Sequence, residues 1–456
     1  ADQELGHAID SLMAMFDRHT APLLAALPRA AVHGDPNDYN VLVGGGDDVE
    51  SGEQTVTGLV DFGDMTHSYR IGDLAIAMAY MVFGESDPLA ALAPMVRGYC
   101  EAVTPTENEL GALFGLVALR LCTSACIAAD QQRQRPDNEY LGVSQRAIAR
   151  ALPLLAGIPF ALAEAVFRDA AGLEPVAVSP RVVAYLESLP SIAPVLRINP
   201  QREPSVVLDL SVGSALISGD PVENSEPRIT ARVLDTMRRA NAKLGIGRYD
   251  EARLIYAAPE FGTAGDPLGE RRTIHIGLDL FAPVGTPVLA PLDGEVYAWA
   301  DQRMPQDYGP VIVLRHELDD GTEFFTLYGH LSRKSLDGLS VGMPVSAGEQ
   351  FATLGPAEVN GGWTPHLHLQ LITNGLGLGV RFPGVARASQ RRVWRSLCPN
   401  ANLIARVPAD RFPAPEPDRV ATLAARRALI GRNLSIAYRE PVKVVRGWRQ
   451  HLSDDD

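Results

Sequence analysis

Lysine and cysteine are both scarce in this chain of 456 residues. Its three lysines are Lys243, Lys334 and Lys443, so none precedes residue 243. The formal net charge is −14, and we expect no nucleic-acid partner because phosphate binding needs a basic face. The four cysteines are too few and too scattered for a disulfide framework, which favours a reducing, cytoplasmic setting.

A long apolar run and a secretion signal are also missing. Arg120 interrupts the stretch 111–129, and Pro153 and Pro159 interrupt the stretch 152–167, so we expect no membrane span. The first residues are acidic and lack the basic start and apolar run of a signal peptide. Because the chain starts without Met and stops abruptly in aspartates, we expect it to be a piece of a longer protein.

The order of patterns predicts a multidomain α+β protein, since this length carries a prior of about three domains. Residues 1–170 begin with β-rich runs broken by Gly, Pro, Asn and Asp. Alanine- and leucine-rich stretches with helical spacing follow at 73–83, 107–130 and 143–155. Prolines crowd residues 171–205, which predicts a linker because proline disrupts helix interiors and central strands.

Residues 206–400 are predicted to form a β-rich domain with an N-terminal extension. The extension reads as strands at 206–218 and an amphipathic helix at 226–243, and residues 273–372 show only short apolar runs between Gly and Pro turns. Residues 401–456 hold another proline cluster and then a basic, helix-like stretch.

A possible zinc site lies in the β domain. His275, Asp279 and His368 offer two imidazoles and one carboxylate, the three-ligand set of a catalytic zinc that keeps one position for water. On a flat strand, residues four apart lie roughly 13 Å from each other, too far to share one ion. The backbone must therefore bend between the first two ligands, and Gly277 is the permissive residue. A helical pair is the alternative, which the β context and the glycine disfavour.

Two further histidines are candidates for catalysis. His366 lies two residues before His368 in an apolar run, so both side chains share one face of a strand. His366 can then face the water that the metal activates, as a general base. His330 is the natural second polar group, stabilising the oxyanion as water attacks a carbonyl. A lone histidine is more often a core residue, but four together favour a metal site; His316 is interpreted as structural or supporting.

The segments "HIGLDLFAPVGTPVLAPLDGEV", "TLYGHLS" and "PHLHLQL" resemble the three signatures of the lysostaphin-type zinc metallopeptidases, the LytM and endolysin-like family. The resemblance covers about residues 245–380. It implies a compact antiparallel β fold with its core at about 245–380. It also implies a groove with one Zn²⁺ held by His275, Asp279 and His368, with His366 and His330 as catalytic histidines. Members of this family mostly cut glycine-containing peptide bonds in peptidoglycan. The stretch "LGPAEVNGGWTP" before the last signature is longer than the usual turn of small residues.

A second motif, "HGDPNDYN" followed by "GLVDFGD", has the spacing of phosphoryl transfer. Asp35 would accept the proton of a substrate hydroxyl, while Asn40 and Asp61 would hold Mg²⁺. With "RIGDLAIAMAY" the segment resembles the C-terminal lobe of aminoglycoside phosphotransferase-like kinases, including choline and hydroxylysine kinases. Such kinases also need a lysine and a phosphate-binding loop from an N-terminal lobe for ATP. We therefore expect the lobe in this chain to be inactive, with its N-terminal part missing.

Residues 422–452 resemble the N-terminal arm of class III pyridoxal-phosphate aminotransferases; a basic surface helix is the alternative interpretation. The three resemblances predict a fusion that includes a downstream aminotransferase domain. The main hypothesis for function is a zinc-dependent endopeptidase acting on a peptide or a small molecule. The alternatives are an amino-alcohol kinase lobe, and a β domain that only binds a ligand or spaces two enzymes.

Overall fold

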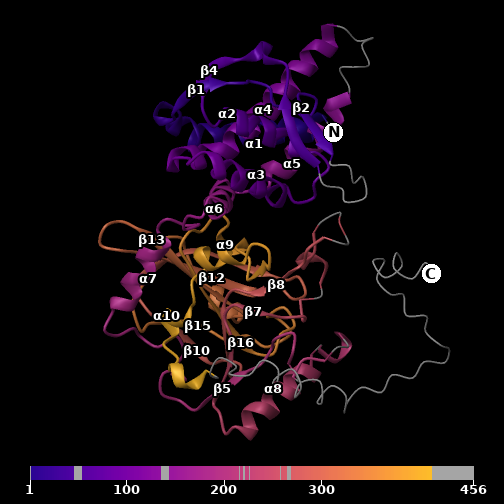
Figure 1. Ribbon diagram of the computed structural model, residues 1–456. Helices are drawn as coiled ribbons and strands as arrows, with labels where there is room; N and C mark the ends of the chain where they lie inside the picture. Colours follow the sequence, from indigo (N-terminus) through magenta and orange to yellow (C-terminus); the bar gives the residue numbers. More distant parts are fainter. Residues whose placement is uncertain are drawn as a thin grey trace, which may run out of the picture.

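The computed structural model describes residues 2–45, 54–134, 143–214, 216–218, 221–224, 226–256, 258–263, 266 and 269–412. A mainly helical lobe, residues 2–170, is followed by a β domain, residues 179–412 (Figure 1). This is the mixed helical and β architecture that the sequence predicts. The aminotransferase-like stretch 422–452 lies outside the described residues and stays a prediction.

The helical lobe contains the helices predicted from periodicity and several more. Its helices are α1 (Asp2–His19), α2 (Gly72–Met81), α3 (Pro88–Ala102), α4 (Glu107–Gln134), α5 (Val143–Ala156) and α6 (Phe160–Ala170). Its strands are β1 (Arg29–Val32), β2 (Val41–Gly45), β3 (Gln54–Leu59) and β4 (Thr66–Tyr69), which form the antiparallel pairs β1–β4 and β2–β3. The sequence interpretation missed α1, although Ala8, Leu12 and Phe16 repeat every four residues and are buried along one face.

Helix α4 forms the centre of this lobe. Leu110, Leu113, Val117 and Leu121 are almost fully buried, and the helix packs against α1, α2, α5 and α6. Among the described residues α4 is the one helix that is long and apolar enough by itself to cross a membrane, and α5 and α6 qualify only as a sharply bent pair. Half of the most apolar window of α4 is buried inside the lobe.

The β domain is built on one large sheet. Within the described part of the chain its strand order is β14-β11-β12-β13-β16-β9-β6-β5, antiparallel throughout except for the parallel pair β5–β6. A smaller sheet has the order β17-β8-β7, and β10 pairs with β15. The strands are β5 (Ser205–Leu208), β6 (Leu244–Gly247), β7 (Glu251–Ala252), β8 (Arg272–His275), β9 (Leu278–Phe281), β10 (Pro287–Leu289), β11 (Gly294–Gln302), β12 (Gly309–Glu317), β13 (Glu323–Gly329), β14 (Pro344–Val345), β15 (Gln350–Thr353), β16 (His366–Ile372) and β17 (Val385–Arg387).

The segments before the sheet differ from the sequence interpretation in two places. The proline-rich stretch 171–205 contains α7 (Ser179–Ser188), whose Val182 and Leu186 are fully buried in the core under the large sheet. Proline is accepted at its first turn, where the missing N–H would have no partner in the helix. Among the described residues of 206–218, where strands were expected, β5 is the one strand that forms. The amphipathic helix is α8 (Arg228–Arg239).

The two lobes contact each other at α9 (Arg391–Leu397), through buried apolar residues that join it to α6 in one cluster and through polar side chains. Arg392 pairs with Asp169 at 2.6 Å, and the hydroxyl of Ser396 accepts the backbone N–H of Val176 at 3.0 Å. Elsewhere along this boundary Arg387 pairs with Asp87. After α9, helix α10 (Asn402–Ala405) adds buried apolar residues to the β-domain core.

Candidate metal centre and active-site cavity

The three predicted ligands come together because the chain changes sheets between the first two. His275 ends β8 in the small sheet, and Asp279 is the second residue of β9 in the large sheet. The predicted bend therefore exists, at residues 276–277. On β16 the residue directly opposite Asp279 is His368, so the antiparallel register brings the third ligand into place.

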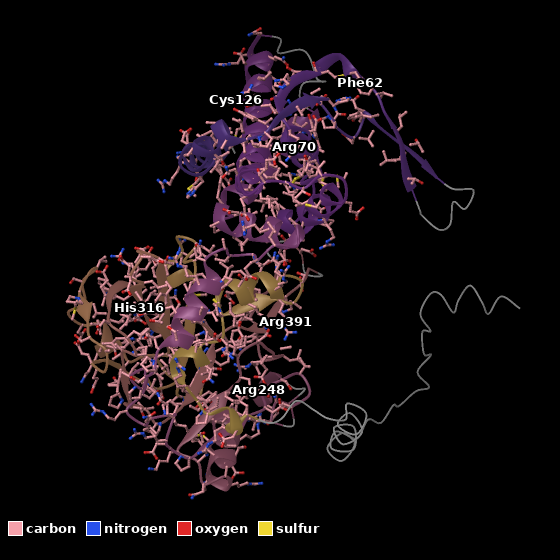
Figure 2. The ribbon with its side chains drawn as sticks, turned by 60° about the vertical axis from the view of Figure 1, so that its left-hand side comes forward. Phe62, Arg70, Cys126, Arg248, His316 and Arg391 are labelled. Atoms are coloured by element: carbon pink, nitrogen blue, oxygen red, sulfur yellow. The ribbon has the colours of Figure 1, made fainter. Side chains whose placement is uncertain are left out.

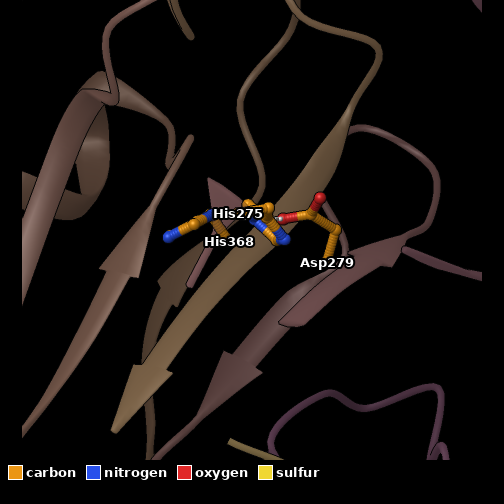
Figure 3. A group of neighbouring side chains, drawn as sticks. All are labelled: His275, Asp279 and His368. Carbon is orange, nitrogen blue, oxygen red and sulfur yellow. Dashed lines mark hydrogen bonds and ion pairs between the residues drawn. The ribbon is translucent and has the colours of Figure 1, made fainter. Parts of the chain in front are cut away.

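The three donor atoms form a nearly equilateral triangle (Figure 3). His275 Nε2, Asp279 Oδ1 and His368 Nδ1 lie 3.1 Å from one another along each edge. Ligands bonded at about 2.0–2.1 Å in a tetrahedron would lie roughly 3.3 Å apart, so the triangle fits one zinc ion with a fourth position free. All three side chains are buried, and among the described residues no other group of three His, Cys, Asp or Glu side chains has this spacing.

The protons of both histidine ligands are directed away from the centre. His275 donates from Nδ1 to the carbonyl of Arg248 at 2.9 Å, which leaves the lone pair of Nε2 facing inward. His368 donates from Nε2 to the Oε1 of Gln370 at 3.0 Å, which leaves the lone pair of Nδ1 facing inward. Such partners fix the tautomer and orientation of metal-binding histidines. The donor set therefore fits a metal ion before one binds.

Gly277 is needed at the bend for space. Its φ is not among the positive values, so the permissive backbone that the sequence interpretation assumed is not used. A Cβ on Gly277 would instead lie 2.4 Å from Cε1 and 2.6 Å from Nε2 of His368. The close approach of this backbone to the imidazole excludes any side chain.

His366 and His330 lie side by side next to the ligands, with ring centroids 4.3 Å apart. His366 donates from Nδ1 to the carbonyl of Thr364 at 2.6 Å, and its Nε2 lies 3.7 Å from Asp279 Oδ1. His330 donates from Nδ1 to the carbonyl of Asn360 at 2.8 Å. It also has a φ of 64°, a left-handed conformation that is uncommon for a residue with a side chain. Both rings therefore present an unprotonated Nε2 when neutral.

Burial keeps these histidines neutral. It lowers the pKa of His275 to about 4, and it lowers the pKa of His366 and, more strongly, that of His330. Burial alone would raise the pKa of Asp279, but the neighbouring His275 and Arg253 hold it well below its usual value. An ionised Asp279 beside a neutral His275 is the protonation state that a zinc site requires.

Two residues that support the ligands were not predicted. The Oε1 of the fully buried Gln370 accepts two hydrogen bonds, one from His368 Nε2 and one from the hydroxyl of Tyr308. The pattern "HLHLQ" could have revealed it, because His366, His368 and Gln370 alternate on one face of β16 while the leucines between them enter the opposite core. The other residue is Arg253, whose Nη1 lies 2.7 Å from Asp279 Oδ2; no sequence signal marks it.

A cavity of about 550 Å³ opens onto the metal centre. The three ligands, His330 and His366 line it, and Tyr256, Phe261 and Trp363 form an aromatic wall. Ile229 and Val233 of α8 line it as well, so the N-terminal extension contributes to the groove. The hydroxyl of Thr230 lies 2.7 Å from that of Thr364, which joins α8 to the loop that holds His366.

His316 lies outside this centre, as the sequence interpretation expected. Its Nδ1 lies 2.7 Å from the carbonyl of Asp293, its Nε2 lies 2.8 Å from Thr326 Oγ1, and its ring stacks on Phe324. In Figure 2, His316 lies apart from Arg248, the residue whose backbone carbonyl accepts the hydrogen bond of the ligand His275. The role of His316 is to satisfy buried polar groups between β12 and β13.

The predicted phosphotransfer residues lie in two adjoining loops of the helical lobe. Asp73 of α2 accepts the backbone N–H groups of His33 and Gly34, which fixes the loop that carries Asp35. The side chain of Asn40 donates a hydrogen bond to the backbone carbonyl of Asp35 at 2.9 Å. The backbone carbonyl of Asn40 accepts a hydrogen bond from the N–H of Val60, which directly precedes Asp61.

Two features of this region were not foreseen. Arg120 of α4, noted in the sequence only as a break in an apolar stretch, pairs with Asp35 at 2.9 Å. Phe62, next to Asp61, is exposed beside the hairpin of β2 and β3, which extends away from the helices (Figure 2). In this lobe Asp35 is therefore held in an ion pair, and the apolar side chain of Phe62 is exposed to solvent.

Comparisons with known proteins divide the chain in the same way. Residues 273–378 match peptidase family M23, and residues 1–112 match the phosphotransferase enzyme family. Hydroxylysine kinase of Xenopus laevis is 32% identical over 148 residues, which are 32% of this chain and 40% of that protein. An uncharacterized metalloprotease of Haemophilus influenzae is 36% identical over 146 residues, 31% of this chain and 28% of that protein.

The solved catalytic domain of lysostaphin from Staphylococcus simulans shares 27% identity, covers 28% of this chain and 84% of its own, and has a TM-score of 0.20. The chain spans less than half the length of either curated relative. It combines a β domain that matches peptidase family M23 with a helical lobe that matches the phosphotransferase enzyme family.

Proposed function

We propose that the β domain is a zinc-dependent endopeptidase that cuts peptide bonds in a glycine-containing peptide. The observation that carries the proposal is the triangle of His275 Nε2, Asp279 Oδ1 and His368 Nδ1, with edges of 3.1 Å and with both imidazole protons directed outward. A zinc ion at this centre would supply Lewis-acid chemistry, activating water and polarising the scissile carbonyl.

The surrounding residues then have distinct tasks. His366 holds its Nδ1 proton on the carbonyl of Thr364, so its Nε2 is free to accept a proton as general base. His330 is oriented by Asn360 and faces the same space; once its Nε2 takes up a proton that the attacking water releases, it donates to the developing oxyanion. The apolar wall of Tyr256, Phe261 and Trp363 binds the chain of the substrate and excludes bulk water.

The test is hydrolysis of a fluorogenic glycine-rich peptide by the purified chain. Chelation should abolish the activity, zinc should restore it, and His368→Ala should lack both zinc and activity. His316→Gln, which changes a buried histidine away from the centre, should keep both. Stoichiometric zinc in His368→Ala, or cleavage that survives chelation, would rule out the assignment.

A second candidate function is phosphoryl transfer by the helical lobe, as part of a kinase for a small amino alcohol. Its support is the hydrogen bonds that join Asn40 to Asp35 and to Val60, the residue before Asp61, together with the similarity to hydroxylysine kinase. Asp35 would be the base, and Asn40 and Asp61 would hold Mg²⁺ beside ATP. A longer chain should then release ADP with hydroxylysine or ethanolamine, and a lack of ADP release above background would remove this candidate.

The cellular setting is proposed to be reducing and cytoplasmic. Its support is that all four cysteines are free thiols, including Cys122 and Cys126, which lie one turn apart on α4. A relative named peptidoglycan DD-endopeptidase, from Vibrio cholerae, is 34% identical over 103 residues. Peptidoglycan lies outside the cytoplasm, so a cell-wall substrate would require a different setting. Assays should therefore compare free glycine-containing peptides with cross-linked peptidoglycan as substrates.

A further inference from the structure

Arg253 is one of the most deeply buried charged side chains of the β domain, with 2% of its surface exposed. It follows β7 and reaches across to the large sheet. Its Nη1 lies 2.7 Å from Asp279 Oδ2, and its Nε lies 2.9 Å from Glu251 Oε2. A guanidinium so far from water keeps its charge only when carboxylates pair with it, and here one of those carboxylates belongs to the metal centre.

The ion pair is part of a chain of alternating charges. Glu251 places its second oxygen, Oε1, 2.7 Å from Arg248 Nε, and Arg248 in turn lies 2.5 Å from Asp209, next to β5. Five charged side chains thus run in the order Asp209, Arg248, Glu251, Arg253 and Asp279. The N-terminal extension is therefore connected to a metal ligand through fixed hydrogen bonds.

The backbone at Gly247 and Arg248 leaves room for the ion pair of Arg253 and Asp279 and adds a hydrogen bond to it. Arg253 Nη2 donates to the carbonyl of Arg248 at 3.3 Å, and the same carbonyl accepts the proton of His275. Gly247 faces the pair directly: a Cβ there would lie 2.9 Å from both Arg253 Nη2 and Asp279 Oδ2. Any side chain at this position of β6 would push the guanidinium and the carboxylate apart.

We propose that Arg253 is a positioning residue that occupies Asp279 Oδ2, so that Asp279 offers only Oδ1 to the metal. Oδ1 is the oxygen that lies 3.1 Å from both ligand nitrogens. A carboxylate that binds through one oxygen leaves the fourth position open, whereas binding through both oxygens would fill it. This inference rests on the zinc centre of the proposed function and extends it to the residue that sets the binding mode of one ligand.

The experiment compares the full chain with Arg253→Lys. Lysine keeps the positive charge but lacks the planar fork that reaches Glu251, Asp279 and the Arg248 carbonyl together. Zinc affinity, measured by competition with a chromophoric chelator, should fall by about 10–100-fold. In the cobalt-substituted protein the visible absorption should weaken, because a carboxylate binding through two oxygens raises the coordination number.

Arg315→Lys is the matched control. Arg315 also bridges two carboxylates, Glu295 and Glu323, but contacts none of the metal ligands. The zinc affinity and cobalt spectrum of the Arg315→Lys variant should therefore equal those of the parent. Glu251→Gln is a second variant, which loosens Arg253 without touching Asp279; its affinity should fall by less than that of Arg253→Lys.

The outcomes separate the two proposals. If the parent binds zinc and both Arg253→Lys and Glu251→Gln keep the parent's affinity and cobalt spectrum, the positioning role is wrong and the zinc centre remains. If Arg253→Lys does not fold, a parent-like Glu251→Gln alone overturns the role. If the parent itself binds no zinc, the proposed function fails and this inference fails with it.

Discussion

At the scale of single residues, the centre is defined by where each imidazole proton goes. His275, His330 and His366 each donate to a backbone carbonyl, while His368 donates to Gln370. The inward nitrogens of the two ligands are therefore free for metal, and those of the other two histidines are free for protons. By this geometry a neutral His330 is an acceptor, so it stabilises an oxyanion only after it gains a proton.

The first prediction concerns His366→Ala and His330→Ala. Each variant should keep zinc, because neither ring is among the three donors, and should lose peptide hydrolysis by about 10²–10³-fold, because a proton-transfer or oxyanion group is gone. Zinc content by elemental analysis and the rate on the same peptide measure the two effects. A variant that cleaves like the parent would show that its histidine has no role in the chemistry.

The second prediction concerns Gly277→Ala. The added methyl group would meet the His368 ring at 2.4 Å, so the ring must move and zinc affinity should fall by about 10-fold or more. Gly98→Ala is the control, since a Cβ there meets nothing within 4 Å and alanine is the better helix former in α3. Equal zinc affinity in both variants would mean that the close approach is not required.

At the scale of elements, β12 and β13 join through a buried polar contact. His316 and Thr326 hydrogen-bond inside the sheet at 2.8 Å, and the ring of Phe324 stacks on the imidazole. Burial, the largest effect, lowers the pKa of His316 from 6.5 to about 4, so the sheet holds this ring in its neutral form.

The third prediction follows from that lowered pKa. Because the unfolded chain binds this proton more readily, His316 reduces stability as the pH falls from about 6.5 to about 4, by at most about 3 kcal/mol. His316→Gln should be less stable than the parent at pH 7, where its hydrogen bonds are lost, and the gap should narrow toward pH 4. Thermal unfolding of both proteins at saturating zinc measures the gap; a gap that stays constant with pH would contradict the neutral assignment.

At the scale of the whole molecule, two lobes that match different enzyme families share one chain. The helical lobe brings Asp35 and Asn40 together but pairs Asp35 with Arg120, and its sequence has no lysine to contact a nucleotide phosphate. The β domain, by contrast, brings His275, Asp279 and His368 together at one cavity, which His330 and His366 also line. Arg392 and Ser396 connect the two lobes through hydrogen bonds to Asp169 and Val176.

The fourth prediction is that this chain does not phosphorylate amino alcohols or aminoglycosides with ATP and Mg²⁺. The Arg120 ion pair engages the base, and no lysine precedes Lys243. ADP release, measured by a coupled assay, should equal that of Asp35→Asn, which is the matched control. Mg²⁺-dependent turnover that disappears in Asp35→Asn would refute this expectation.

The sequence by itself determined the donor set and its local order. The spacing of His275 and Asp279 demanded a bend, and the alternation of His366, His368 and Gln370 put three polar side chains on one face of β16, because strand side chains repeat every two residues. Helical spacing likewise indicated α2, α4 and α5. These features depend on neighbours along the chain, which a sequence displays directly.

Only the tertiary structure decided what surrounds the donors. Arg253 reaches Asp279 across two sheets, Gly277 is required by a ring 91 positions away along the chain (368 − 277), and α7 is a core helix inside a proline-rich stretch. Arg120, a break in an apolar run by sequence, contacts Asp35 from another element. Each of these contacts joins segments that are distant in sequence, and their geometry is set by how strands and helices pack, which no local pattern encodes.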